Sequence, residues 1–119
     1  MQDKTAETLR ILLVEDSLLL QDMLTEELGE IPGVKVCARA KGEQEAMELL
    51  EAHPVDLAIV DLELSEGTGL GVLRQLHSWP ERFGTLHAVV FSSYGHLSVR
   101  ARCSALGVAA FFDKAVGTD

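Results

Sequence analysis

Short apolar runs recur along this chain, and each is followed by a polar or charged residue. The clearest are Ile11-Leu12-Leu13-Val14 before Glu15 and Asp16, Leu57-Ala58-Ile59-Val60 before Asp61, Ala88-Val89-Val90-Phe91 before Ser92, and Phe111-Phe112-Asp113 before Lys114. Runs of this length, separated by helix-length segments, are typical of buried parallel strands. In an open parallel sheet the carboxyl ends of the strands share one edge, where ligands bind. The sequence therefore predicts an α/β fold that gathers these polar residues at one edge.

The segments between the runs have the spacing of helices. We predict strands at 10–14, 34–38, 56–60, 87–91 and 109–112, a first helix that begins after Ser17 and ends near Gly29, and further helices at 43–52, 69–77 and 97–106. Ser17 is the expected N-cap of the first helix. The first helix has an apolar face at helical spacing, formed by Leu20, Met23, Leu24 and Leu28. Leu18 and Leu19 add an apolar patch on the outer side of this helix. The alternation of strands and helices predicts right-handed crossovers and helices on both faces of the sheet.

Composition limits the class of protein. A chain of 119 residues that is 47% hydrophobic fits one packed domain, 1–119, with a polar tail at 1–8. No apolar stretch approaches the ~18 residues that span a bilayer, and the first residues lack a signal-peptide core, so we expect a cytoplasmic protein. A net charge of −9 without a basic cluster argues against direct nucleic-acid binding. Cys37 and Cys103 lack metal-ligand spacing, so we expect reduced thiols.

The residues at the strand ends suit a divalent cation and a phosphoryl group. Mg²⁺ prefers hard oxygen ligands, which Glu15, Asp16 and Asp61 supply, and without a cation three crowded carboxylates would repel one another. Aspartate accepts phosphoryl groups as an acyl phosphate, so Asp61 is the candidate acceptor. Ser92 and Lys114 could bind the phosphoryl oxygens. Each residue alone fits a helix cap or a solvated side chain, and only their joint placement at strand ends is specific.

Several motifs together resemble the receiver domain of two-component response regulators, over nearly the whole chain. They are Leu12-Leu13-Val14-Glu15-Asp16-Ser17, Val60-Asp61-Leu62 with Gly67-Thr68-Gly69-Leu70, Phe91-Ser92-Ser93 and Phe112-Asp113-Lys114. The resemblance implies a doubly wound sheet of five parallel strands in the flavodoxin-like order 2-1-3-4-5. It also implies that Asp61 takes a phosphoryl group from a phosphohistidine on a sensor histidine kinase or a histidine phosphotransfer protein.

The resemblance assigns further roles residue by residue. Glu15, Asp16 and Asp61 would hold Mg²⁺ together with the backbone carbonyl of Glu63. Ser92 takes the position of the switch hydroxyl, Lys114 that of the family lysine, and Phe111 that of the aromatic switch residue. The Glu63 side chain would change the phosphoryl lifetime by positioning or by repelling the hydrolytic water. The protein would signal to a downstream protein target, and its chemistry would be limited to its own phosphorylation and autodephosphorylation.

The chain departs from the family pattern in three places. Ala115 replaces a proline that is usually cis; a cis bond before another residue costs ~2.5–4 kcal/mol, so we expect a trans loop and a less firmly aimed Lys114. Ser65 stands where proline is common, which would loosen the loop after Asp61. Five residues follow Lys114, so we expect the fifth helix to be missing or truncated and no output domain. The exposed last strand then predicts dimerisation or a swapped element.

Two other functions fit parts of the sequence. A pseudo-receiver with the same fold would bind partners without being phosphorylated, but it would not need all five strand-end residues. Residues 61–65 are distantly similar to the Asp-x-Asp-x-Thr signature of haloacid-dehalogenase phosphatases, although that signature normally ends the first strand and not the third. The Gly67-x-Gly69-x-Gly71 segment does not match the dinucleotide-binding fingerprint and predicts a loop and a helix start.

Overall fold

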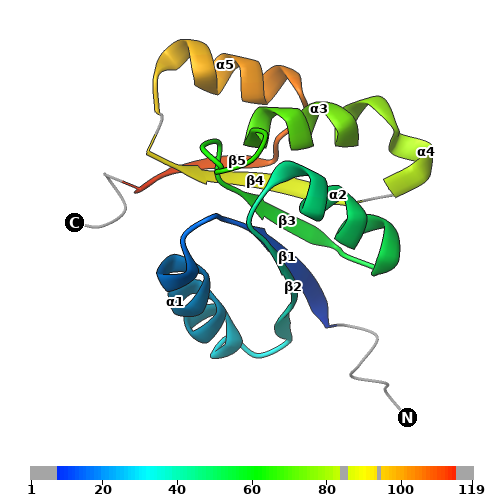
Figure 1. Ribbon diagram of the computed structural model, residues 1–119, viewed down its shortest axis with the longest axis vertical. Helices are drawn as coiled ribbons and strands as arrows, with labels where there is room; N and C mark the ends of the chain where they lie inside the picture. Colours follow the sequence, from blue (N-terminus) through cyan, green and yellow to red (C-terminus); the bar gives the residue numbers. More distant parts are fainter. Residues whose placement is uncertain (1–7, 84–85, 94, 115–119) are drawn as a thin grey trace.

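The computed structural model describes residues 8–83, 86–93 and 95–114, which form one parallel sheet with helices on both faces (Figure 1). The five strands lie in the order β2-β1-β3-β4-β5. They are β1 (Leu9–Val14), β2 (Val34–Ala40), β3 (Leu57–Val60), β4 (His87–Ser92) and β5 (Ala110–Asp113). The helices are α1 (Leu18–Gly29), α2 (Glu43–Ala52), α3 (Gly69–Ser78), α4 (Pro80–Phe83) and α5 (Leu97–Ala105). The predicted doubly wound fold and strand order are confirmed.

The direction of each crossover decides which face a helix covers. The connection from β1 to β2 runs toward one end of the sheet, and the connections from β2 through β5 run toward the other. Right-handed crossovers therefore place α1 on one face and α2, α3 and α5 on the opposite face, as Figure 1 shows. None of the described helices combines the length and apolarity needed to cross a membrane.

The main core lies between the sheet and α2, α3 and α5. Leu12 and Val14 of β1, Val60 of β3 and Val90 of β4 are each inaccessible to solvent, and Leu73 of α3 is 1% exposed. These residues belong to one apolar cluster. Alternate residues of the central strands enter this cluster because successive side chains of a strand point to opposite faces.

The other face of the sheet is covered unevenly. Ile11 and Leu13 are buried, whereas Ile59 and Val89 on the next two strands are only half-buried. Phe112 on the edge strand β5 is 56% exposed, as expected for a poorly shielded last strand. The predicted absence of a helix after β5 concerns residues outside the described part of the chain, and so does the peptide bond after Lys114.

One short helix was not predicted. Pro80 ends α3, as expected, but it also begins the four-residue α4. Proline suits the first position of a helix because its missing N–H would have no intrahelical partner there. The backbone N–H groups of Arg82 and Phe83 donate to the carbonyl oxygen of Trp79 at 3.0 and 3.2 Å. Proline therefore acts here as both a stop and a start signal.

The residues that α1 buries also differ from those that the apolar spacing predicts. Leu18 and Leu19 are 58% and 70% exposed, as the predicted outer patch requires. Met23, however, is 45% exposed, while Gln21 is only 3% exposed. A polar side chain thus occupies a buried position of α1, and its hydrogen bonds at the sheet edge, described below, explain why.

An ion pair joins the amino ends of β1 and β3. Asp56 Oδ2 accepts from the backbone N–H of Arg10 at 2.8 Å and from its Nε at 3.1 Å, and Asp56 Oδ1 accepts from Nη2 at 3.2 Å. The side-chain hydrogen bonds from Arg10 lower the pKa of Asp56, with a further contribution from the backbone hydrogen bond. A carboxyl group with a lowered folded-state pKa stabilises the fold above its unfolded-state pKa, and this contribution is lost as the pH falls through the folded-state pKa.

We expect Asp56→Asn to lower the free energy of unfolding at neutral pH. The gap between the wild type and the variant should shrink as the pH falls below about 3.9, the ordinary pKa of aspartate, and on through the lower folded-state pKa, because protonation of Asp56 then removes the stabilising charge. Urea titrations at several pH values measure the gap, with Glu26→Gln on the exposed side of α1 as the control. A gap that stays constant through acid pH would contradict the assigned role of the Asp56 charge.

Candidate functional site

Three carboxylates meet at the carboxyl ends of β1 and β3. One oxygen from each of Glu15, Asp16 and Asp61 lies within 4.8 Å of the others. The strand ladder positions two of these residues: the N–H of Glu15 donates to the Ala40 carbonyl at 2.9 Å, and the N–H of Asp61 donates to the Val14 carbonyl at 2.9 Å. Glu15 and Asp61 are buried, and Asp16 is the most accessible of the three. The predicted cluster of carboxylates is therefore present as a compact group.

Lys114 bridges the two buried carboxylates. Its Nζ lies 2.9 Å from Glu15 Oε1 and 3.0 Å from Asp61 Oδ2. The side chains of Lys114, Glu15 and Asp61 are 19%, 5% and 8% exposed. We expected Lys114 to be loosely aimed, but in the structure its ammonium donates to both carboxylates. Two charge-assisted hydrogen bonds thus orient Lys114 although no proline follows it.

The environment changes the pKa values of this group. Burial raises the pKa of Glu15, and the charge of Asp61 adds to this effect, while hydrogen bonds from Lys114 and from the N–H of Ser17 oppose it. Burial alone would lower the pKa of Lys114, but hydrogen bonds to Glu15 and Asp61 outweigh burial and raise it. The ammonium form of Lys114 is therefore favoured because two carboxylates share its charge.

The loop after β3 approaches Asp61 through its backbone. The N–H of Glu63 donates to Asp61 Oδ1 at 3.3 Å, and the N–H of Gly69 donates to the Leu62 carbonyl at 3.0 Å. A Cβ atom on Gly69 would collide with the backbone carbonyl oxygen of Asp61, so this position requires glycine. Both oxygens of Asp61 thus have hydrogen-bond donors, while the Glu63 side chain itself is exposed.

The remaining predicted residues lie on β4 and β5. Ser92 is fully buried at the carboxyl end of β4, where it pairs with Asp113. Phe111 is half-buried on β5, and the guanidinium carbon of Arg100 lies 4.4 Å from the centre of its ring. Lys114 Nζ lies 5.5 Å from the centre of the Phe91 ring. The same sheet edge therefore carries the hydroxyl and the ammonium that the sequence placed there.

Gln21 is a site residue that the sequence did not reveal. Its Nε2 donates to the Glu15 carbonyl at 2.6 Å and to the Ala40 carbonyl at 3.2 Å. The amide thereby ties α1 to the ends of β1 and β2, directly behind the Glu15 carboxylate. The sequence shows only an uncharged polar residue between Leu20 and Asp22, which does not distinguish a buried amide from a solvated one.

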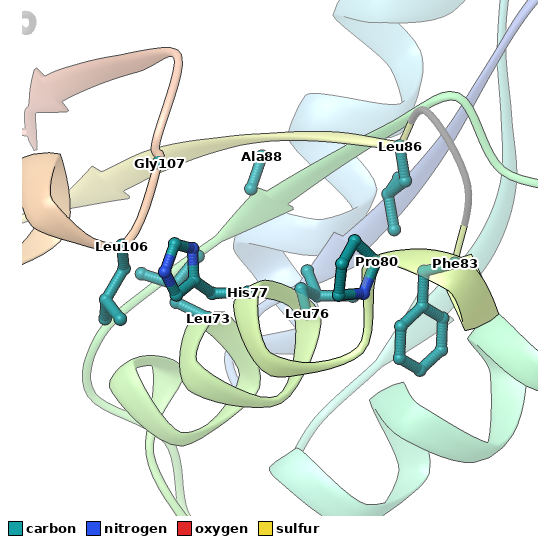
Figure 2. Close-up of a pocket in the computed structure, with 9 residues that line it drawn as sticks. All are labelled: Leu73, Leu76, His77, Pro80, Phe83, Leu86, Ala88, Leu106 and Gly107. Carbon is teal, nitrogen blue, oxygen red and sulfur yellow. The ribbon is translucent and has the colours of Figure 1, made fainter.

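A hollow lined by none of the three carboxylates offers no comparable chemistry (Figure 2). It lies beside α3 and α4 and is mostly apolar, and His77 is its one titratable lining residue. The lining residues are Leu73, Leu76, His77, Pro80, Phe83, Leu86, Ala88, Leu106 and Gly107. The strand-end cluster remains the site with a reactive set of side chains.

The family model for the response regulator receiver domain matches residues 11–119. This match covers all of the sheet except the first two residues of β1, and it includes every strand-end residue described above. The chain belongs to this family. Receiver domains bind Mg²⁺ at an acidic pocket of the kind formed here by Glu15, Asp16 and Asp61. They also interact with histidine kinases and with downstream effector domains.

Similar proteins include parts of longer regulators. A protein-glutamate methylesterase/protein-glutamine glutaminase of Treponema denticola is 29% identical over 115 residues, which are 95% of this chain and 30% of that protein. A probable C4-dicarboxylate response regulator of Bacillus subtilis is 30% identical over 67 residues, which are 56% of this chain and 30% of that protein. The matched residues thus span less than a third of the length of each of these relatives.

Solved structures also have this fold. The phosphorylated cyanobacterial phytochrome response regulator RcpA superposes with a TM-score of 0.80 and 25% identity, over 90% of this chain and 81% of that one. The signal receiver domain of the putative response regulator NarL from Mycobacterium tuberculosis superposes with a TM-score of 0.82 and 23% identity, over 91% of this chain and 85% of that one. The second likeness supports the fold alone.

We expect Lys114→Ala to lower the free energy of unfolding by about 2 kcal/mol in metal-free buffer, because it removes hydrogen bonds between charged groups and leaves two carboxylates facing each other. Urea titration with a chelator present measures the change. Lys35→Ala, on the exposed side of β2, is the matched control. A loss no larger than that of the control would show that the Lys114 bridge does not stabilise the fold.

Proposed function

We propose that Asp61 accepts a phosphoryl group from a phosphohistidine on a sensor histidine kinase or a histidine phosphotransfer protein, in a Mg²⁺-dependent reaction. The observation that carries the proposal is the bridging of Glu15 and Asp61 by Lys114 inside a group of three carboxylates. A purely structural ion pair needs one partner for one charge. Here an excess of negative charge gathers around one ammonium, as suits a site that also receives a cation.

The acceptor chemistry follows from the position of Asp61. One of its oxygens forms a bond to phosphorus as the P–N bond of phosphohistidine breaks, which produces an acyl phosphate and releases the histidine. Lys114, already within hydrogen-bond distance of Asp61, neutralises a phosphoryl oxygen. Ser92, at the adjacent strand end, donates a hydrogen bond from its hydroxyl to another phosphoryl oxygen. No external phosphoester is consumed, so the chain turns over only its own phosphoryl group.

The metal ligands would be Glu15, Asp16, Asp61 and the backbone carbonyl of Glu63. The donor set is hard oxygen, as Mg²⁺ prefers, and three of its members already lie within 4.8 Å of one another. When bound, the ion offsets the repulsion between the carboxylates and the incoming phosphoryl oxygens. Lys114 provides part of this charge neutralisation without the ion, because its ammonium pairs with Glu15 and Asp61.

The signal would pass through Ser92 and Phe111. Movement of the Ser92 hydroxyl toward the phosphoryl group opens space for the Phe111 ring to turn inward, which changes the surface formed by α5 and β5 for a downstream protein target. In the structure the Phe111 ring is half-buried and lies under Arg100 of α5, so a change at the ring reaches that helix. The phosphorylated RcpA structure, similar over 90% of this chain, supports a phosphorylated state for this fold.

The alternative is a pseudo-receiver that binds partners without phosphorylation. The joint presence of Glu15, Asp16, Asp61, Ser92 and Lys114 speaks against it, because partner binding does not require buried carboxylates around an ammonium. The methylesterase activity named for the Treponema denticola relative belongs to a protein that this chain covers to 30%, and we do not extend it to this domain.

Acetyl phosphate with Mg²⁺ is expected to add about 80 Da to the intact protein, the mass of one phosphoryl group on an aspartate. Asp61→Asn should abolish the adduct because it removes the nucleophilic carboxylate. Asp56→Asn, at the opposite edge of the sheet, is the control that keeps the adduct. Intact-mass spectrometry reads both. The pseudo-receiver gains support if the folded wild type stays unmodified.

Removal of the metal is expected to prevent the same modification. A chelator, which removes Mg²⁺, or Asp16→Ala, which removes one of its proposed ligands, should slow adduct formation by at least about tenfold, because the bound ion would offset the repulsion between the carboxylates and the phosphoryl oxygens. The time course of the intact mass measures the rate, and excess Mg²⁺ should restore it for the chelated wild type. An unchanged rate in chelator would show that Lys114 alone supports phosphorylation.

A further inference from the structure

Two glutamates join the loop after β3 to the beginning of α2. Glu66, on the loop, accepts the N–H of Gln44 on its Oε1 at 3.1 Å, and its backbone carbonyl accepts the N–H of Glu43 at 3.0 Å. Glu43, the first residue of α2, reaches in the opposite direction. Its Oε1 accepts the N–H of Thr68 at 3.0 Å, and its Oε2 accepts from Gln75 Nε2 of α3 at 2.9 Å. We call Glu43 and Glu66 the glutamate clasp.

Glycines make room for both carboxylates. A Cβ atom on Gly42 would lie 2.5 Å from Glu66 Oε1, and a Cβ atom on Gly71 would collide with the carboxylate of Glu43. Gly67 has a φ of +70°, a left-handed conformation that favours glycine, and lies against the Glu43 side chain. The fit of each carboxylate against a bare backbone indicates a specific contact between the loop and α2.

An ordinary explanation for Glu43 is that acidic residues favour the first turn of a helix. The hydrogen bonds of Glu43 and Glu66 indicate a different role for Glu43. Glu66, from the loop, accepts from the first amides of α2, whereas the Glu43 carboxylate accepts only from Thr68 and from Gln75 among the described residues. Glu43 therefore holds the loop and α3, and its own helix is capped by another residue.

The clasp connects to the acceptor through a short series of contacts. Thr68, held by Glu43, pairs with Glu63 in an antiparallel bridge, and the N–H of Glu63 donates to Asp61 Oδ1 at 3.3 Å. Thr68 also caps α3, since its Oγ1 accepts the N–H of Gly71 at 2.9 Å. A displacement of Thr68 would thus move the backbone of Glu63, whose carbonyl is a proposed metal ligand.

We propose that Glu43 is a positioning residue for the phosphoacceptor loop: it fixes Thr68 and thereby the Glu63 carbonyl that completes the metal site. The proposal rests on the function proposed above. It also explains how a chain with Ser65 in place of the usual proline keeps this loop in place, because a side chain of α2 supplies the restraint.

Two variants remove the contacts of the Glu43 carboxylate in different ways. Glu43→Ala deletes the carboxylate, and Gly71→Ala displaces it sterically while adding a residue that favours helix at an α3 position. Each variant should weaken Mg²⁺ binding by about tenfold, as is typical when a residue that orients a metal ligand is lost. Calorimetric titration with Mg²⁺ measures the affinity, and urea titration records the stability of each variant.

Three further variants separate positioning from general stability. The double variant should lose no more affinity than either single variant, since both remove the same contact. Glu43→Gln should retain most of the affinity, because its amide oxygen still accepts from Thr68 and Gln75 can turn its own amide to match. Glu48→Ala, on the exposed side of α2, should leave the affinity unchanged.

Each outcome decides the proposal. A tenfold loss in both single variants, without further loss in the double variant, supports it. Lowered stability with unchanged Mg²⁺ affinity, or additive losses in the double variant, overturns it. If the wild type binds Mg²⁺ but never takes a phosphoryl group, the proposed function fails while the affinities still decide the role of Glu43. A wild type that binds no Mg²⁺ overturns both proposals.

Discussion

The site depends on one ammonium shared by two buried carboxylates. Lys114 lies 99 residues from Glu15 and 53 from Asp61 in sequence, and its two hydrogen bonds tie the ends of β1, β3 and β5 together. Without a cation, two carboxylates at this depth would repel each other and favour protonation. The raised pKa values of Glu15 and Lys114 reflect this balance between burial and charge. The sheet topology, the hydrogen bonds from the Gln21 amide and the glycine at position 69 all help to hold these groups in place.

The sheet could be predicted from sequence because buried parallel strands must be apolar on both faces. The runs ending at Val14, Val60 and Phe91 therefore predicted three strands, and the resemblance to receiver domains predicted their order in the sheet. The acidic cluster followed, since topology alone brings those run ends to one edge. Elements that depend on one or two particular contacts were harder to predict. The helix that starts at Pro80 and the buried amide of Gln21 depend on partners far along the chain or on a residue type with two ordinary uses.

The aim of Lys114 and the glutamate clasp show the same limit. The proline that usually follows the family lysine is a local sequence feature, and its absence predicted a loosely held Lys114. The hydrogen bonds from Lys114 to Glu15 and Asp61 are tertiary contacts, which no local feature of the sequence predicts. Glu43 and Glu66 gave no sequence signal beyond acidity. Only the structure shows that each carboxylate lies against a glycine of the other segment. The candidate site thus combines strand-end residues that the sequence pattern predicts with supporting contacts that it does not predict.

The most direct test of the acceptor role proposed for Asp61 is ³¹P NMR of the protein with Mg²⁺ and phosphoramidate, whose P–N bond matches that of phosphohistidine. This role predicts a new acyl-phosphate resonance that grows as phosphoramidate is consumed, and that is absent when Asp61→Asn replaces the wild type. A folded wild type that consumes no phosphoramidate, or a resonance that persists in Asp61→Asn, would contradict it.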